Sequence, residues 1–339
     1  MSEIVKIELQ NFRSYEKASF ELGERTLVLG ANGSGKSNLI EAIYLLATGK
    51  SFRAERDVEM VRYGEQFSII NSQFINNDQI FNLQITLTNR KSFEVNGVPR
   101  RMMDFVGNLR AVCFGPGDME LVTGSPSVRR RYLDFVISQV DREYRRCLIS
   151  YERGLRQRNK LLDMIRDGLA NRSQLFFWDK LLIKNGEYLT MKRGEYLEGL
   201  VEYDKSVISE ARLKQYEVEE VAAATTLVGP HRDDFVIMVN TSPLHPSPNL
   251  GEGNIRDVSK YGSRGEQRMA VLGLKRREIE YLGGNPILLL DDIFSELDHK
   301  HREEVIKLVR DYPGQVIMTS ADEHLVPDIT GFKIIRLSL

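Results

Sequence analysis

The segment that decides the fold is GANGSGKS at residues 30–37. It matches the pattern G-x-x-x-x-G-K-S, in which glycines allow successive backbone N–H groups to wrap round phosphate groups. In such a loop Lys36 reaches the β- and γ-phosphates of ATP, and the Ser37 hydroxyl ligates Mg²⁺. The candidate nucleotide-binding residues are Gly30, Ala31, Asn32, Gly33, Ser34, Gly35, Lys36 and Ser37.

The flanking sequence supports this interpretation. Residues 26–29 form a short apolar run that is typical of a buried strand, and the run ends at Gly30. From Lys36 onward the apolar residues recur with helical spacing, and Gly49 is placed to end the helix. A strand, a glycine loop and a helix in this order direct the positive end of the helix at the bound phosphates. A chance glycine-rich loop would lack this context.

A second element of an ATPase site follows about 250 residues later, at residues 287–292 with the sequence ILLLDD. A buried apolar strand that ends in acid projects Asp291 toward Mg²⁺, and Asp292 beside it can orient the attacking water. Many buried strands end at aspartate, so this segment carries weight only together with the glycine loop. We therefore predict Asp291 and Asp292 as the catalytic acids.

The third element, SRGEQ at residues 263–267, distinguishes between classes of ATPase. Taken alone, Ser263 at a helix start is an ordinary cap, although such a helix end also binds anions. The order S-x-G-x-Q, acidic strand, then SELD at residues 295–298 is that of the signature motif, catalytic strand and D-loop of ABC ATPases. Ser263, Gly265 and Gln267 are therefore further candidates for nucleotide contact.

Outside these motifs the chain changes character along its length. Alternating apolar residues predict a half-buried first strand at residues 5–9 and a small antiparallel sheet at residues 66–98. Residues 109–114 predict a buried strand. Long, charged helical sequence occupies residues 127–212, and strand and helix patterns return after residue 235.

The expected fold is α/β: an ABC-type P-loop ATPase head, with a mixed sheet, helices and an antiparallel β-subdomain, into which an α-helical lobe is inserted. We place the discontinuous ATPase lobe at residues 1–114 and 225–339 and the helical lobe at residues 115–224. The Pro/Ser/Gly-rich residues 241–253 predict a mobile loop.

Charge gives no direct answer about nucleic acid, because 47 Lys and Arg against 48 Asp and Glu leave a net charge of −1. Any contact with DNA must come from a local patch. Between Arg129 and Lys160 ten basic residues face four acids. Arg142, Arg145 and Arg146 in this run are candidate DNA contacts, with an ordinary solvated helix face as the alternative.

The chain has no run of 18 apolar residues, so neither a transmembrane helix nor a membrane partner is expected. The first ten residues, MSEIVKIELQ, lack the basic start and apolar block of a signal peptide. Cys113 and Cys147 have no CxxC spacing, which favours two buried free thiols in a bacterial cytoplasm.

Four further segments carry a resemblance to a known family: NFRSY at 11–15, LVTGSP at 121–126 with RRRYLD at 129–134, GPHRDD at 229–234, and LDDIFSELD at 290–298. Together with the ATPase motifs they resemble the RecF family of bacterial recombination-repair ATPases, which are related to SMC heads. The chain departs from that family where Gly117 follows Pro116, with Asp118 one position later. It also lacks a recognisable Q-loop glutamine or switch histidine, and Thr319 and Ser320 stand where a γ-phosphate sensor is expected.

The resemblance implies a two-lobed ATPase that forms a homodimer with ATP and binds single-stranded, gapped or junction DNA. It also implies RecO- and RecR-type partners, the loading of RecA, and a nucleotide contact from Arg13. Asp292 replaces the glutamate common in transporters and is one methylene shorter, so slow hydrolysis is expected.

Two other functions use related ATPase motifs. An ABC transporter subunit is shorter, carries an L-S-G-G-Q type signature and lacks a charged helical insert of a hundred residues. An SMC-like structural protein needs sustained heptads for a long coiled coil, and the interval between Lys36 and Asp291 contains none. The motifs therefore favour an ATP-dependent DNA-repair clamp.

Overall fold

The computed structural model describes residues 2–76, 79–199, 201–240, 255–295, 299–326 and 330–338. The chain divides into two compact units, the first formed by residues 1–118 and 275–339 and the second by residues 119–274. The predicted loop at residues 241–253 and residues 296–298 of the predicted D-loop lie outside the described residues.

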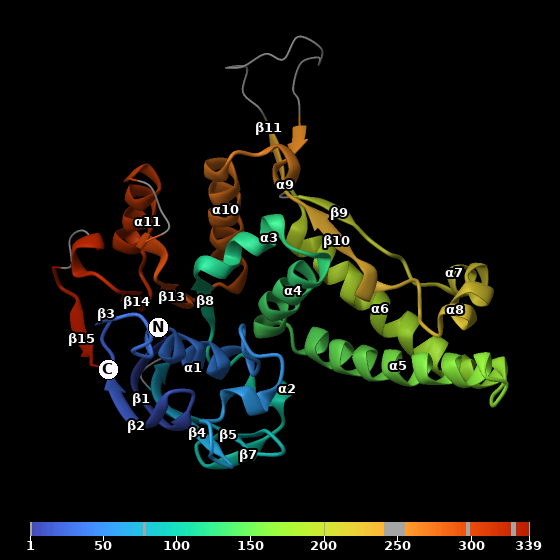
Figure 1. Cartoon of the computed structure of the whole chain (residues 1–339), viewed down its shortest axis with the longest axis horizontal. Helices are drawn as coiled ribbons and strands as arrows, with labels where there is room; N and C mark the ends of the chain where they lie inside the picture. Colours follow the sequence, from blue (N-terminus) through green and yellow to red (C-terminus); the bar gives the residue numbers. More distant parts are fainter. Residues whose placement is uncertain are drawn as a thin grey trace, which may run out of the picture. The chain divides into compact units, whose positions relative to one another are not determined.

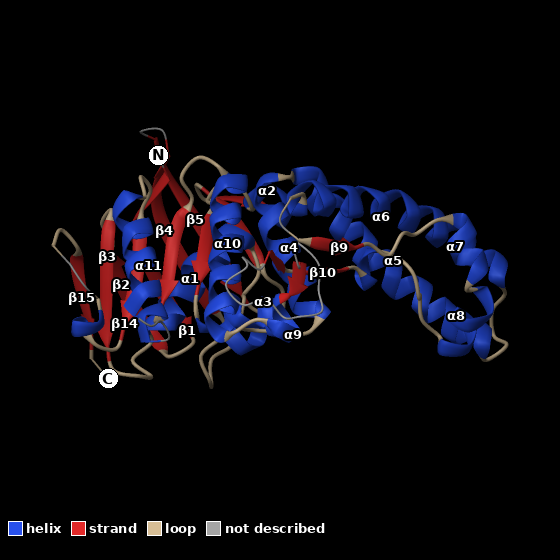
Figure 2. Cartoon of the chain, turned by 90° about the horizontal axis from the view of Figure 1, so that it is seen from above, coloured by secondary structure: helices blue, strands red, loops and turns tan. Residues whose placement is uncertain are grey.

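A parallel sheet forms the centre of the first unit (Figures 1 and 2). In spatial order its strands are β15 (Lys333–Leu337), β3 (Arg25–Gly30), β14 (Val316–Ser320), β13 (Ile287–Asp291) and β8 (Ala111–Phe114). Every residue of β8, β13 and β14 is buried. Each begins with a run of at least three apolar residues, as a parallel strand covered on both faces requires.

An antiparallel sheet forms the second layer of this unit. Its strands are β2 (Tyr15–Glu21), β1 (Ser2–Phe12), β4 (Ser68–Asn76), β5 (Gln79–Leu87), β6 (Ser92–Val95) and β7 (Val98–Arg100), in that spatial order. β6 and β7 are joined by Asn96 and Gly97, both with positive φ, which is the conformation that a two-residue hairpin turn needs. The predicted sheet at residues 66–98 is thus confirmed, and β1 and β2 extend it.

The helix after the glycine loop, α1 (Lys36–Thr48), contacts strands of both sheets. Eleven of its 13 residues are buried, so it has almost no solvent face. Gly49 ends it in the left-handed conformation, with φ 70° and its N–H bonded to the Leu45 carbonyl, as predicted. The first turn of α1 is therefore fixed at the carboxyl end of β3.

The remaining elements of the first unit are short or lie on its surface. They are η1 (Asp57–Met60), α2 (Met102–Phe105), η2 (Pro116–Met119), η5 (Ile293–Ser295), α11 (His299–Asp311) and η6 (Glu323–Leu325). Gln315 connects the two sheets, because its side-chain amide bonds the backbone N–H and C=O of Ile4 at 2.9 and 2.8 Å.

The second unit is mainly helical. It contains α3 (Glu120–Thr123), α4 (Pro126–Val140), α5 (Arg142–Arg166), η3 (Arg172–Leu175), α6 (Phe176–Leu197), α7 (Glu210–Gln215), α8 (Glu217–Ala223), η4 (Pro230–Arg232) and α9 (Val258–Tyr261). The short strands β9 (Glu202–Asp204), β10 (Asp234–Val236), β11 (Met238–Asn240) and β12 (Ile255–Asp257) pair as β9–β10 and β11–β12. α5 packs along α6 (Figures 1 and 2), and Gly154 allows the close approach, since a Cβ there would lie 2.6 Å from Leu181 Cδ2.

Buried arginines hold the second unit together. Arg193 donates to Asp233 and Asp134 at 3.0 and 2.9 Å, and Arg129 forms a bidentate pair with Asp234 at 2.6 and 2.8 Å. The RRRYLD and GPHRDD segments, a hundred residues apart in sequence, therefore meet in space. Their acids and arginines act first as internal ties of this unit.

The second boundary between the units lies later than the sequence predicts. The expected lobe change at residues 224/225 falls inside the second unit, where β10 pairs with β9, and β11 pairs with β12. The contact boundary lies within α10 (Arg264–Leu282), between residues 274 and 275. None of the described helices is long and apolar enough to cross a membrane.

Candidate functional site

The glycine loop joins β3 to α1 in a conformation that only glycine adopts readily. Gly33 and Gly35 have φ of 85° and 102°. A Cβ on Gly35 would lie 2.7 Å from the Tyr15 hydroxyl, whereas one on Gly33 would meet nothing within 4 Å. The loop is thus packed on one side and open on the other.

The loop also contains a buried polar atom that is placed to bind a ligand. The Ser34 hydroxyl is buried and has no hydrogen-bond partner among the described residues. A buried hydroxyl without a partner is costly, and a phosphate oxygen would satisfy it. The loop residues therefore fit the phosphates of a nucleotide.

The side chain of Lys36 is oriented by hydrogen bonds to the glycine loop. Its side chain is buried, and its ammonium donates to the carbonyls of Gly30 and Ala31 at 2.6 and 3.0 Å. An ammonium group has three donors, so one remains for a phosphate oxygen. The two carbonyls thus position the charge before any ligand arrives.

Three side chains meet beside this loop at the carboxyl ends of two strands. Ser37 of α1 donates to Asp291 Oδ1 at 2.9 Å, and Thr319 of β14 donates to the same oxygen at 2.8 Å. Asp291 and Thr319 are register partners on the adjacent strands β13 and β14. The hydroxyl and carboxylate predicted to ligate Mg²⁺ are therefore in contact, and both are oxygen ligands of the kind Mg²⁺ prefers.

Asp292 occupies a strained position directly after this cluster. Its φ is 50°, a left-handed conformation that is uncommon for residues other than glycine, and its N–H donates to Thr319 Oγ1 at 3.0 Å. Strained backbone of this kind is found at active sites, where surrounding contacts compensate for its cost. Thr319, which the sequence placed only near a sensor position, holds both acids in place.

The signature segment begins α10 with a reciprocal cap. Ser263 Oγ accepts from the Glu266 N–H at 3.3 Å, and the Glu266 carboxylate accepts from the Ser263 N–H at 2.7 Å. Gln267 donates through its side chain to the Val258 carbonyl at 3.3 Å. Ser263 is exposed, and Gly265 directly follows the first residue of the helix. Ser263 therefore caps α10 in the ordinary way, and it also leaves the helix start exposed, where an anion can bind.

Arg13 is engaged with a buried acid. Its guanidinium forms two hydrogen bonds with the Glu41 carboxylate, at 2.8 and 2.6 Å, and Glu41 is fully buried in α1. A third bond joins it to the Glu59 carbonyl at 2.7 Å. The two residues after it lie closer to the loop, because Tyr15 donates to the Gly35 carbonyl at 3.0 Å and Ser14 accepts from Asn38. Burial raises the pKa of Tyr15 to about 12, so it remains a hydrogen-bond donor.

A buried ion cluster lies where the chain leaves and re-enters the first unit. Lys275 pairs with Asp118 at 3.0 Å and with Glu278 at 3.2 Å. Burial alone would lower the pKa of Lys275, but the two carboxylates raise it above its ordinary value. Asp118 also accepts from the Gly115 N–H at 2.8 Å, and a Cβ on Gly115 would lie 3.4 Å from Asp291 Cβ. The loop that follows β8 is thus fixed against β13, which carries the predicted magnesium ligand Asp291.

Comparison with known proteins gives the family. The family model for the RecF/RecN/SMC N terminal domain matches residues 3–337. The DNA replication and repair protein RecF of Thermomicrobium roseum is 34% identical, over 98% of this chain and 97% of that relative. The protein of the same name from Shouchella clausii is also 34% identical, over 94% and 93%. The chain belongs to the RecF family.

Solved structures agree with this assignment. The recombination mediator protein RecF with ATP, in the RecFOR pathway, is 28% identical with a TM-score of 0.85, over 99% of this chain and 95% of that one. An SMC head bound to the C-winged helix domain of ScpA is 18% identical with a TM-score of 0.55, over 99% and 94%, and shows the fold alone. The predicted ABC-type ATPase fold is confirmed, and as a RecF-family member this chain is an ABC-type ATPase.

The structure separates the three arginines predicted to contact DNA in this RecF-family chain. Arg142 and Arg146 are exposed on α5. Arg145 is only 7% exposed, and its guanidinium donates to the Ser138 carbonyl inside the helical unit. The prediction for Arg145 therefore needs correction, because its position in the sequence does not reveal that its side chain is buried.

Proposed function

We propose that this chain is an ATP-dependent DNA clamp of bacterial recombinational repair, in which ATP joins two copies on single-stranded, gapped or junction DNA. RecF relatives are named DNA replication and repair proteins, and a RecF structure with ATP belongs to the RecFOR pathway. We further propose that hydrolysis is slow, that DNA stimulates it, and that RecO- and RecR-type partners use the clamp to support RecA loading.

The observation that carries the proposal is a contrast between two parts of the predicted ATP site. One part, which we call the closed half, is a hydrogen-bonded cluster at the glycine loop, and the other, the open half, is the exposed helix start at Ser263. The glycine loop, Ser37, Asp291 and Thr319 form a hydrogen-bonded cluster in the first unit. Ser263, in the second unit, starts α10 at an exposed position. Each copy would then present Ser263 and its helix N-terminus to the nucleotide held by the other copy.

The roles of the residues follow from their positions. Lys36 and the backbone N–H groups of the loop hold the phosphates, and Ser37 and Asp291 provide oxygens for Mg²⁺. When bound, Mg²⁺ neutralises the charge that develops on the transferred phosphoryl group. Asp292 accepts a hydrogen bond from the attacking water and orients it, and Thr319 fixes the backbone of Asp292 through its 3.0 Å bond.

Sedimentation velocity of the purified chain tests the proposal. Monomer is expected without nucleotide, dimer with ATP, and a dimer–DNA complex when ATP and a gapped duplex are both present. ADP in place of ATP is the matched control and should leave a monomer. A chain that stays monomeric with ATP, or that binds the gapped duplex equally well in ADP, would contradict the clamp.

A further inference from the structure

One face of α5 is exposed and basic over most of its length. Its exposed cations are Arg142, Arg146, Arg153, Arg156 and Lys160, which we call the α5 basic face. With about 3.6 residues per turn, the spacings of four, seven, three and four residues bring all five side chains onto one side of the helix. At about 1.5 Å per residue they extend over about 27 Å.

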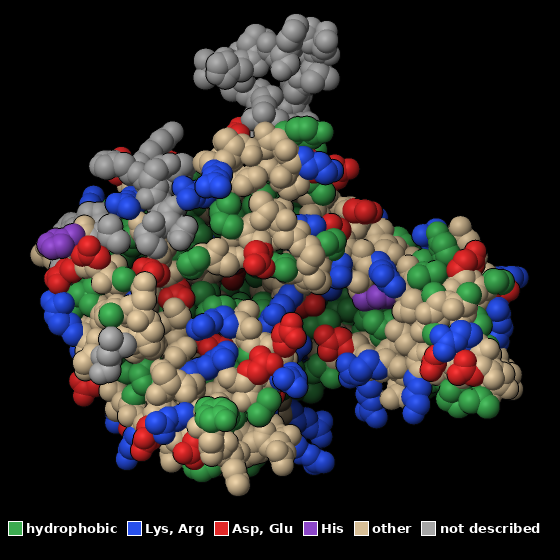
Figure 3. Space-filling view, in the orientation of Figure 1, with side chains coloured by type: hydrophobic (Ala, Val, Ile, Leu, Met, Phe, Trp, Pro, Cys, Tyr) green, Lys and Arg blue, Asp and Glu red, His purple; other side chains and the backbone are tan. Residues whose placement is uncertain are grey.

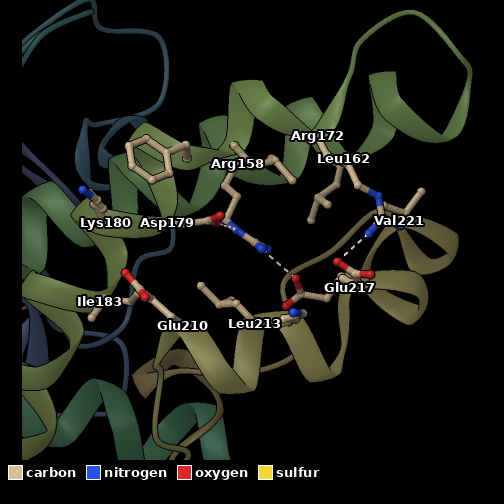
Figure 4. Close-up of a pocket in the computed structure, with 14 residues that line it drawn as sticks. Arg158, Leu162, Arg172, Asp179, Lys180, Ile183, Glu210, Leu213, Glu217 and Val221 are labelled. Atoms are coloured by element: carbon tan, nitrogen blue, oxygen red, sulfur yellow. Dashed lines mark hydrogen bonds and ion pairs between the residues drawn. The ribbon is translucent and has the colours of Figure 1, made fainter.

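The opposite side of α5 fixes the orientation of this face. Tyr144, Cys147 and Leu162 are at most 2% exposed. Arg158, also on the buried side, donates to Asp179 and Glu220, both at 2.7 Å (Figure 4). Because the buried side is held by apolar packing and by this ion-paired arginine, the helix cannot turn its cations inward. The five basic side chains must stay in solvent.

The cations at the centre and far end of this face are not ion-paired with described residues, unlike two other exposed arginines of the unit. Arg153, Arg156 and Lys160 form no ion pair or hydrogen bond with any described residue, whereas Arg166 pairs with Asp163 and Arg172 with Glu217. Arg146 shares the carboxylate of Glu143 at the start of the helix. Most of the positive charge on the face is therefore not neutralised within the unit.

Such an arrangement weakens the helix itself. Arg142 and Arg146 stand four residues apart, Arg153 and Arg156 three apart, and Arg156 and Lys160 four apart. Like charges at these spacings destabilise a helix by about 0.2–0.5 kcal/mol per pair. A bound polyanion would turn this destabilisation of the helix into stabilisation, because it would lie against all five cations at once.

We propose that the α5 basic face binds the phosphate backbone of duplex DNA. The proposal rests on the DNA-binding function proposed above and names its contact surface. A length of about 27 Å corresponds to about eight base pairs at 3.4 Å per phosphate along one strand. Four of the five cations are arginines, whose guanidinium groups bind phosphate in bidentate fashion. Figure 3 shows Lys and Arg side chains along the lower edge of the helical unit, where α5 runs in Figure 1.

Contacts of this kind position a protein on DNA without reading its sequence. Between Arg142 and Lys160 the other exposed residues of α5 are Glu143, which pairs with Arg146, and Ile149 and Gln157. Binding through it should therefore be independent of base sequence and strongly dependent on salt. An anionic membrane is the competing occupant, and binding of anionic vesicles is measured beside duplex binding.

The test compares two variants of the full chain that lose the same charge. The first carries Arg153→Gln, Arg156→Gln and Lys160→Gln. The control carries Arg172→Gln, Lys180→Gln and Lys214→Gln, three exposed cations that line a cavity of about 340 Å³ between α5, α6 and α7 (Figure 4). Binding to a random 30-base-pair duplex is measured with ATP over a range of salt concentrations, and thermal melting checks that both variants fold.

For the first variant the slope of log affinity against log salt should become shallower by about 2 to 3, at about 0.9 per lost phosphate contact. Its affinity at about 0.1 M salt should fall by at least tenfold, and the control should match the unaltered chain. Equal losses in both variants, or an unchanged slope in the first, would overturn the proposal. So would ATP-dependent binding of anionic vesicles that depends on the face while duplex binding does not. If the unaltered chain binds no DNA, the proposed function fails first, and that result is seen before any variant is compared.

Discussion

The two halves of the proposed ATP site differ in how they are built. The phosphate-binding half is buried, with Lys36 6% and Asp291 7% exposed. It is also held together by hydrogen bonds, because Ser37 and Thr319 both donate to Oδ1 of Asp291. The signature half is an exposed serine at a helix start, held locally by the reciprocal cap with Glu266. A half that is complete without a partner binds ligand alone, whereas an exposed half requires a second surface.

The largest effect is expected from Lys36→Met, which removes the only formal cation of the glycine loop. ATP binding measured by calorimetry should be lost, because the phosphates would face backbone dipoles alone. Lys17→Met, an exposed lysine on β2, is the matched control and should bind normally. Near-normal ATP affinity in Lys36→Met would show that the phosphate-binding half is wrongly identified.

Asp292→Asn should separate binding from turnover. The amide keeps the shape of the side chain but cannot act as a base, so hydrolysis should fall by about 10²- to 10⁴-fold while ATP affinity is retained. ATP-bound dimers should accumulate on a sizing column. Unchanged single-turnover hydrolysis would exclude Asp292 as the residue that orients the water.

Lys275→Met tests the support behind the closed half. It leaves the buried carboxylate of Glu278 and the partly buried carboxylate of Asp118 without this cation, so the free energy of unfolding should fall by about 3–5 kcal/mol. Thermal or urea unfolding measures this loss. Lys307→Met, an exposed lysine of α11, should change the same quantity by less than about 0.5 kcal/mol. Similar stabilities in the two variants would contradict the role given to the cluster.

Glu266→Ala should have the smallest effect, on the open half. It removes one side of the reciprocal cap of α10 and should lower the free energy of unfolding by about 1 kcal/mol. ATP binding by the isolated chain should not change, because α10 begins in the other unit. A clear loss of ATP affinity in the monomer would show that the two halves are coupled within one chain.

The sequence predicts the residues of the closed half better than it predicts the contacts that support them. The closed half depends on local patterns, a glycine loop between strand and helix and an apolar strand ending in Asp291, and each pattern specifies its own geometry. The contacts that support it were missed, because they join distant segments. Tyr15 reaches Gly35, Gln315 bridges to Ile4, and Lys275 pairs with Asp118 without any periodic signal.

In the helical unit too, the sequence predicts the helices but not which of their side chains are buried. Composition predicted a helical segment, and α4, α5 and α6 confirm it. The inward position of Arg145 and the paired state of Arg158 depend on which side of α5 meets the rest of the unit. In a run rich in arginine, helical spacing alone does not decide which arginines are buried with acids and which remain in solvent.

The central claim is that one nucleotide is enclosed by the glycine loop of one copy and Ser263 of the other. It is tested most directly by fluorescence energy transfer between labelled Lys36→Met and Ser263→Arg proteins. Neither variant should dimerise with ATP alone, because the first binds no nucleotide and the second blocks closure with a bulky cation. The mixture has one intact shared site, and we predict ATP-dependent transfer that is absent with ADP. Dimerisation of Ser263→Arg alone, to the extent seen for the unaltered chain, would contradict the account.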